Sequence, residues 1–193
     1  ELLDLFKHIE LLRENIEINK KTSTSDSDGI ELAKLKDLEE SFEKETEFWQ
    51  KSMYSKKMNL LNNIESLINN HWESWNLKKY KDYISSVHSG GTRNGDSNGS
   101  FWYENVPTIK NLTASRKPGD KSSFNARYIE VDVLVPGKAA VAYYYLVGSY
   151  TLGGVTKNDY RTRVSQVFIT EKGQWKIKSG HFSPLHSGSG IPN

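Results

Sequence analysis

The side chain with the most versatile chemistry is that of His181, near the C-terminal end of the chain. It belongs to an alternating stretch, and a strand with a period of two would place on one face Trp175, Ile177, Ser179, His181 and Ser183. We expect this to be the core and pocket face of a sheet. A half-buried imidazole can donate, accept or exchange a proton near neutral pH. His181 is therefore a candidate acid/base, and a hydrogen-bonded structural histidine is the alternative.

Three consecutive tyrosines supply a second group of candidates. In a strand, Tyr143 and Tyr145 lie on one face and Tyr144 on the other, so at least one of their hydroxyl groups points inward. A buried phenol usually finds a hydrogen-bond partner, and it can donate to a carbonyl or carboxylate of a ligand. Packing at a sheet or oligomer interface is the alternative role for these rings.

The composition argues against several kinds of site. None of the 193 residues is a cysteine, so the chain offers neither a disulfide nor a thiolate. The five histidines show no zinc-ligand spacing, and we predict no metal. The paired glycines at residues 90–91 and 153–154 lack the spacing of a nucleotide-binding loop, and we predict no cofactor.

Charge and hydropathy limit the partners. The chain carries 26 Lys and Arg against 24 Asp and Glu, and no stretch concentrates positive charge, so nucleic acid is not an expected partner. No apolar run approaches the roughly 20 residues that span a bilayer, so we expect no transmembrane segment. The chain begins at Glu1 rather than at methionine. We therefore expect a soluble protein that is either cytoplasmic or exported after the loss of an N-terminal segment.

Residues 1–56 are predicted to form an N-terminal helical extension. Apolar residues recur at spacings of three and four over residues 2–20, which indicates an amphipathic helix. A polar, glycine-terminated stretch at residues 22–29 predicts a linker. Residues 30–75 contain neither proline nor glycine, which predicts one long helix, or two in tandem broken near residues 52–57. The first helix can pack on the second as an antiparallel hairpin, or both can pair with another subunit.

Residues 57–193 are predicted to form an α+β domain. A short helix is expected at 77–87 and a Gly-, Ser- and Asn-rich loop at 88–100. The strands expected after this loop cover residues 101–109, 126–135, 139–152, 160–170 and 174–183, and the last two form a hairpin. Helices followed by antiparallel strands are typical of the α+β class. The last strand should pack, through Trp175 and Ile177, on the helix that contains Ile64, Leu67 and Ile68.

The order of elements over roughly residues 57–186 resembles the nuclear transport factor 2-like (SnoaL-like) superfamily. The stretch from Arg163 to Ser183 is similar to the terminal hairpin of that superfamily, in which an Arg-rich strand turns at a glycine and returns through Trp-x-Ile-x-His-x-His-x-Ser. The association domain of calcium/calmodulin-dependent kinase has a similar ending. Ser179 departs from the pattern, because many relatives carry the first histidine there. The resemblance implies a cone-shaped domain with a curved antiparallel sheet and packing helices.

The resemblance also implies where a reaction would occur. In similar isomerases and dehydratases, a carboxylate near the first strand serves as a base and a tyrosine or histidine polarises a carbonyl. The corresponding stretch here offers Glu104, whose pKa would rise if it were buried beside Trp102 and Tyr145. Asp132 is the second choice, and an exposed acid at a strand end is the alternative for Glu104. Arg163 could hold an anionic ligand, as basic residues do in similar domains, or pair with an acid on the sheet.

Three functional hypotheses follow. The first is a domain that binds a small organic or anionic ligand in the cone, through Trp102, Tyr143, Tyr145, Arg163 and His181, and forms a homodimer or higher homo-oligomer through the outer face of its sheet. The second is a cofactor-independent isomerase, dehydratase or cyclase that uses Glu104 or Asp132 with His181 and a tyrosine. The third is an assembly module whose N-terminal helices recruit a protein partner.

Overall fold

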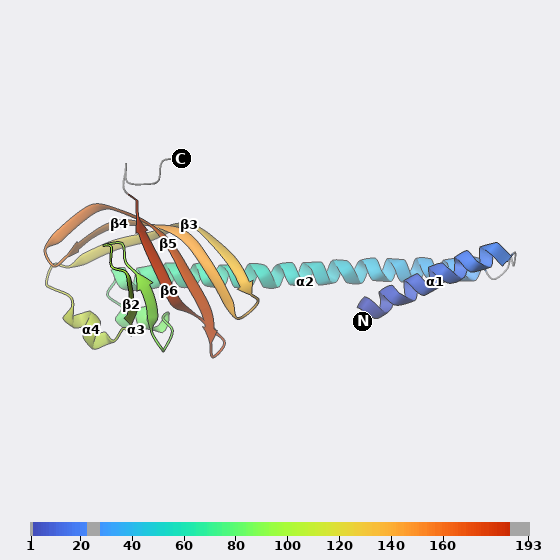
Figure 1. The fold of residues 1–193 in the computed structure, drawn as a ribbon, viewed down its shortest axis with the longest axis horizontal. Coiled ribbons are helices and arrows are strands. Elements are labelled where there is room, and N and C mark those ends of the chain that lie inside the picture. Colours follow the sequence, from blue (N-terminus) through green and yellow to red (C-terminus); the bar gives the residue numbers. More distant parts are fainter. Residues whose placement is uncertain (1, 23–27, 186–193) are drawn as a thin grey trace. The chain divides into compact units, whose positions relative to one another are not determined.

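The computed structural model describes residues 2–22 and 28–185 of the chain (Figure 1). The chain divides into two compact units, Glu1–Asn59 and Leu60–Asn193. The predicted linker at residues 22–29 lies largely outside the described residues. Among the described residues, no helix has the length and apolar character that crossing a membrane requires.

The first unit contains two helices that pack on each other. Helix α1 covers Leu2–Thr22, and α2 begins within this unit and runs over Asp28–Asn76 without the break that we considered near residues 52–57. Residues 30–76 contain neither glycine nor proline, which explains this continuity, because nothing there removes or strains an intrahelical bond. The buried contacts join Ile9 and Ile16 of α1 to Leu35 of α2.

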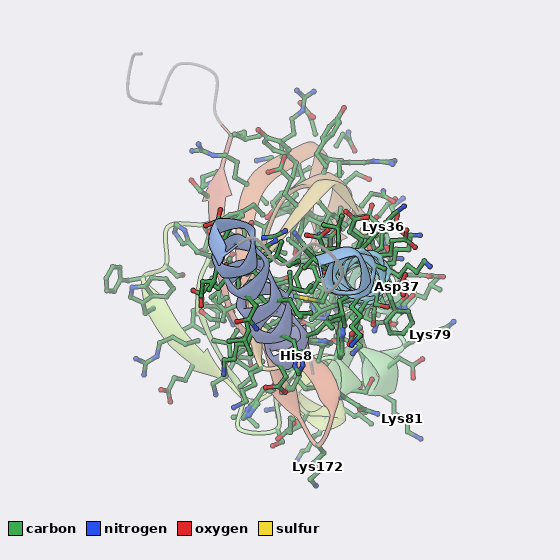
Figure 2. All side chains as sticks on the ribbon, turned by 90° about the vertical axis from the view of Figure 1, so that its right-hand side faces the viewer. His8, Lys36, Asp37, Lys79, Lys81 and Lys172 are labelled. Carbon is green, nitrogen blue, oxygen red and sulfur yellow. The ribbon has the colours of Figure 1, made fainter. Side chains whose placement is uncertain are left out.

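Charged side chains share the remaining surface of this helical pair with exposed apolar ones such as Phe48 and Met53. Arg13 of α1 bonds Glu39 of α2 at 2.6 Å, and the exposed Lys36 and Asp37 point away from α2 (Figure 2). An exposed ion pair of this kind is screened by solvent and contributes little to stability. The apolar contacts of α1 with α2 therefore contribute more to the stability of the pair.

The second unit is a curved six-stranded sheet in the order β2-β1-β6-β5-β4-β3. Its strands are β1 (Thr92–Gly95), β2 (Trp102–Asn105), β3 (Lys121–Val135), β4 (Ala139–Leu152), β5 (Val155–Glu171) and β6 (Gln174–Pro184). Neighbouring strands are antiparallel except β1 and β6, which are parallel. Two short helices, α3 (Tyr80–Ser85) and α4 (Ile109–Ala114), complete the unit. The last turns of α2 lie against the concave face of the sheet (Figure 1).

The core lies between these last turns of α2 and the concave face. Ile64 and Ile68 are fully buried against inward-facing side chains of the long strands, among them Leu146, Phe168 and Ile177. Leu67 and Trp175 pack on the same cluster while remaining partly exposed. The predicted packing of the last strand on this helix is therefore confirmed, and so is the α+β class.

A β-bulge in β6 changes which side chains of the last strand face inward. Phe168 of β5 pairs with Ile177, but the preceding residue, Val167, pairs with Ser179, so Lys178 is an extra residue. Side chains alternate between the two faces of a sheet with a period of two. One extra residue therefore moves each later side chain to the opposite face. Past the bulge, Phe182 packs in the core and His181 is exposed. The expectation that Ser179, His181 and Ser183 share the face of Ile177 is therefore wrong.

The edge of the sheet also differs from the prediction. Strand β1 lies within the stretch 88–100 that was expected to be a loop, and α4 begins at the end of the expected strand 101–109. Strand β1 has only four residues, and its Asn and Gly have weak β-strand propensity. Its pairing with β6 and β2, rather than its composition, therefore explains why this segment is a strand.

Gly148 marks an irregularity in the pairing of β4 with β5. Its φ is +154°, and a Cβ atom there would collide with the backbone carbonyl of Ser123 in β3. Glycine is therefore required for β3 and β4 to approach closely at this point.

Candidate functional site

A cavity of about 500 Å³ opens on the concave side of the sheet. Its walls come from α2, α3, the β1–β2 hairpin and the four long strands. Aromatic side chains dominate the lining, among them Trp72, Trp75, Tyr83, Tyr103, Tyr150 and Tyr160. The polar side chains include Thr92, Asn94, Asp96, Ser97, Asn105 and Gln166. This mixture of rings with a few polar groups is typical of a site for a small organic molecule.

A fully buried hydrogen-bond chain forms one part of the wall. The indole Nε1 of Trp72 donates to the hydroxyl of Tyr144 at 3.0 Å, and that hydroxyl donates to Oε1 of Gln166 at 2.7 Å. Burial raises the pKa of Tyr144, so its phenol stays protonated and remains a donor. The chain connects α2, β4 and β5 and keeps these side chains in fixed orientations.

His71 presents a neutral imidazole to the cavity. Its Nδ1 lies 2.6 Å from the hydroxyl of Ser86, and that hydroxyl donates its only proton to the backbone carbonyl of Tyr83. Nδ1 must therefore carry a proton and donate it to Ser86, which leaves a lone pair on Nε2. Burial lowers the pKa of His71 to about 3, so the ring is neutral at physiological pH and acts as an acceptor.

Asp96 supplies the carboxylate of the cavity. Its Oδ1 accepts the backbone N–H of Ser97 at 2.6 Å, and the Ser97 hydroxyl lies 3.0 Å from that of Tyr160. Burial and the nearby negative charge of Asp96 both raise the pKa of Tyr103, so this phenol is neutral beside the carboxylate. No Lys or Arg of the described residues forms an ion pair with Asp96.

The ring of Trp75 lines the cavity, while its indole donor is buried. Its indole Nε1 is buried and has no partner among the described residues. The guanidinium of Arg116 lies 4.1 Å from the centroid of the Trp75 ring, which is a cation–π geometry. Arg116 itself does not line the cavity.

Four of the predicted ligand-binding residues meet on the opposite face of the sheet. Tyr143, Tyr145, Arg163 and His181 line a shallow hollow of about 350 Å³, which we call the outer-face hollow; Tyr128, Glu130, Ser165 and Ser183 also line it. Tyr143 and Tyr145 point outward because Tyr144 points into the core. Arg163 and His181 also point outward, because side chains alternate between the two faces of a strand. None of these four residues lines the cavity.

The remaining predicted residues do not converge with these. Glu104 of β2 is exposed and forms an ion pair with Arg93 of β1. Trp102 lies two residues away on the same side of β2, with its ring 5.7 Å from that of His181. Asp132 is exposed on β3. The three predicted catalytic residues, Glu104, Asp132 and His181, therefore share no cavity among the described residues.

Sequence reasoning missed Asp96 and Tyr103. Asp96 lies in the hairpin connection within the stretch expected to be a loop, and nothing in its neighbours predicts that it faces a cavity. For Tyr103 the alternation of side chains was a usable signal, because it must face away from Trp102 and Glu104. No group of three or more His, Cys, Asp or Glu side chains in the described part of the chain is placed to hold a metal ion.

The fold is shared with solved structures. No family model and no curated protein matches the chain. A structure described as an uncharacterized protein with a cystatin-like fold, from Caulobacter vibrioides, is 20% identical, covers 65% of this chain and 89% of its own, and has a TM-score of 0.52. A nuclear transport factor 2-like superfamily protein from Salmonella enterica is 17% identical, covers 70% and 99% of the two chains, and has a TM-score of 0.55.

A third similar structure is the CamKII hub homology domain from Chlamydomonas reinhardtii. It is 13% identical, covers 66% of this chain and 98% of its own, and has a TM-score of 0.52. At these identities the likeness concerns the fold. The chain has the nuclear transport factor 2-like, cystatin-like fold, as the terminal hairpin indicated.

Proposed function

We propose that the second unit binds a small organic molecule in the cavity on the concave side of its sheet. The observation that carries the proposal is the cavity lining itself, in which aromatic walls surround a few polar side chains. The neutral imidazole of His71 and the carboxylate of Asp96 are two acceptors among them. A ligand with a ring and a polar substituent would stack on the walls and pair with such groups.

The charges of the lining argue against an anionic ligand. In the part of the chain that the structure describes, no Lys or Arg lines the cavity, and its carboxylate is that of Asp96. Arg163, the residue expected to hold an anion, lies in the outer-face hollow instead. A neutral or positively charged ligand is therefore the electrostatically favoured occupant.

An acid/base reaction on the bound molecule is the second candidate. It is favoured by the presence of Asp96 in the same cavity as several phenols, because a carboxylate can accept a proton while a neutral tyrosine donates a hydrogen bond to the substrate. Tyr160, which is coupled to Asp96 through Ser97, is the donor we assign to this role. The lowered pKa of His71 makes its imidazole a weak base, so we assign it hydrogen bonding rather than proton transfer.

The outer face of the sheet is the surface that we assign to self-association. Tyr128, Tyr143 and Tyr145 leave large aromatic areas in contact with solvent there. Glu130 and Arg163, of opposite charge, line the same hollow. A second copy related by a two-fold axis would cover the rings and could pair these charges, since an isologous interface apposes the same patch twice. The N-terminal helices are the surface that we assign to a protein partner, because Phe48 and Met53 of α2 are exposed there.

Binding in the cavity can be tested with N-phenyl-1-naphthylamine, a neutral dye that fluoresces on entering an apolar site. We expect saturable fluorescence enhancement with the full chain. Leu152→Trp should weaken it, because Leu152 is a partly buried residue of the cavity wall and a larger side chain there narrows the cavity. The matched control, Leu134→Trp on an exposed position of β3, should leave the signal unchanged. Equal enhancement by all three proteins would contradict the proposal.

Self-association can be tested by sedimentation equilibrium. Tyr145→Glu should lower the molar mass to that of the monomer, because it places an additional charge among the aromatic rings of the outer face. Phe101→Glu, at an exposed aromatic position outside the hollow, is the control and should not change the mass. A monomeric parent protein at all concentrations would refute the assignment of this face.

A further inference from the structure

We propose that the cavity selects an organic cation, such as a quaternary or tertiary ammonium group attached to an apolar body. This inference rests on the proposed ligand-binding function and specifies the chemical class of the ligand. It combines two observations, a carboxylate without an ion-pair partner among the described residues and a set of aromatic rings that line the same cavity.

The first observation is the state of Asp96. Its carboxylate lines the cavity and is partly buried, and it accepts the backbone N–H of Ser97 at 2.6 Å and the Ser97 hydroxyl at 3.4 Å. No ion pair with a Lys, Arg or His of the described residues neutralises it. Burying a carboxylate costs free energy unless an opposite charge pairs with it. A bound cation would supply that opposite charge.

The second observation is the arrangement of the rings. Tyr150 and Tyr160 lie 5.7 Å apart, and Phe124 lies 5.1 Å from Tyr160 and 5.8 Å from Trp72. These pairs are edge-to-face, and the partly exposed Tyr150 and Tyr160, together with Tyr103, line the same cavity as Asp96. Ring faces attract cations, and enclosure by several rings is the established means of recognising quaternary ammonium groups.

The other charges around the cavity are compatible with this class of ligand. His71 is neutral, and Tyr103 and Tyr160 remain protonated because burial raises the pKa of each phenol. The guanidinium of Arg116 lies over the ring of Trp75, and Arg116 does not line the cavity. That contact shows that one ring of the wall already binds a guanidinium.

The direct test compares two probes of the same shape that differ in charge, phenyltrimethylammonium and tert-butylbenzene. Each is titrated against the full chain loaded with N-phenyl-1-naphthylamine, and displacement of the dye gives the two affinities. We expect the cation to bind at least about tenfold more tightly, since a desolvated cation–π contact and a carboxylate both act on it alone. Equal affinities, or tighter binding of the hydrocarbon, would overturn the inference.

Two substitutions identify the groups responsible. Asp96→Asn keeps the acceptor for the Ser97 N–H, and we expect it to reduce the affinity for phenyltrimethylammonium about tenfold without changing that for tert-butylbenzene. Tyr103→Leu should also weaken the cation selectively, whereas Tyr103→Phe, which keeps the ring, should not. An equal loss for both probes in Asp96→Asn would mean that the residue only shapes the cavity, and would overturn the inference.

The dye separates this inference from the proposed function. If the dye and the hydrocarbon bind but the cation does not, the cavity is a ligand site and the cation assignment is wrong. If neither the dye nor either probe binds, both the ligand-binding proposal and the cation assignment fail.

Discussion

The two faces of the sheet carry the same kinds of residue, but these residues are buried on the inner face and exposed on the outer face. Tyr143, Tyr144 and Tyr145 are consecutive in β4, yet Tyr144 is 3% exposed and its neighbours are 48% and 41% exposed. The inward phenol is fixed by bonds to Trp72 and Gln166, while the outward pair lines an open hollow. Residue type alone makes tyrosines on both faces candidates for ligand binding. The face on which each side chain is buried decides whether it can contribute to a cavity.

The largest expected difference between the faces is in core packing. Ile177→Ala removes a buried side chain from the inner face and should lower the free energy of unfolding by about 2–5 kcal/mol. Ile169→Ala makes the same chemical change at a partly exposed position and should cost about 1 kcal/mol or less. Urea denaturation of the two variants measures both values, and equal costs would contradict the assignment of faces.

The next effect is the dependence of stability on pH through His71. The pKa of His71 in the folded state is about 3, below the ordinary value of 6.5, so the unfolded chain binds the proton that the folded protein excludes. The stabilisation is complete above pH 6.5 and is lost as the pH falls toward 3, at up to about 1.4 kcal/mol per pH unit. His71→Phe should show a smaller slope between pH 6.5 and 5 in chemical denaturation. An unchanged slope would mean that His71 is accessible to protons in the fold.

A smaller effect is expected from single hydroxyl groups. Tyr144→Phe leaves the indole N–H of Trp72 and Oε1 of Gln166 without their partner, and should lower the free energy of unfolding by about 1–3 kcal/mol. Tyr143→Phe and Tyr145→Phe are matched controls, because their exposed hydroxyls exchange freely with water, and should change it by about 0.5 kcal/mol or less. Similar costs for all three would refute the contrast between the faces.

The smallest effect is predicted for Glu104, the carboxylate first chosen as a base. Glu104→Gln removes an exposed ion pair with Arg93, which is worth about 1 kcal/mol at most. Its affinity for N-phenyl-1-naphthylamine should equal that of the parent chain. Loss of dye binding in this variant would show that the outer edge contributes to the site after all.

Local pattern was sufficient to predict the class of fold and most of its strands. Alternation identified the long strands, and the hairpin motif identified the superfamily fold. The side of the sheet to which His181 points could not be predicted from alternation. The β-bulge at Lys178 reverses the alternation, and the lysine, serine and isoleucine residues around it give no sequence signal for a bulge. Strand β1 was not predicted because it depends on pairing with β6, which lies about 86 residues away in the sequence. Local β-strand propensity carries no information about such a distant partner. The position of Asp96 depends on that same pairing.

The measurement that tests the account most directly is an NMR titration of the five tryptophan indole N–H signals with N-phenyl-1-naphthylamine. Trp72 and Trp75 line the cavity, whereas Trp102 is exposed beside His181 on the outer face. We predict that the signals of Trp72 and Trp75 shift with a common saturation curve and that the signal of Trp102 does not move. A saturable shift of Trp102 with the cavity tryptophans unchanged would place the site on the other face of the sheet and contradict the account.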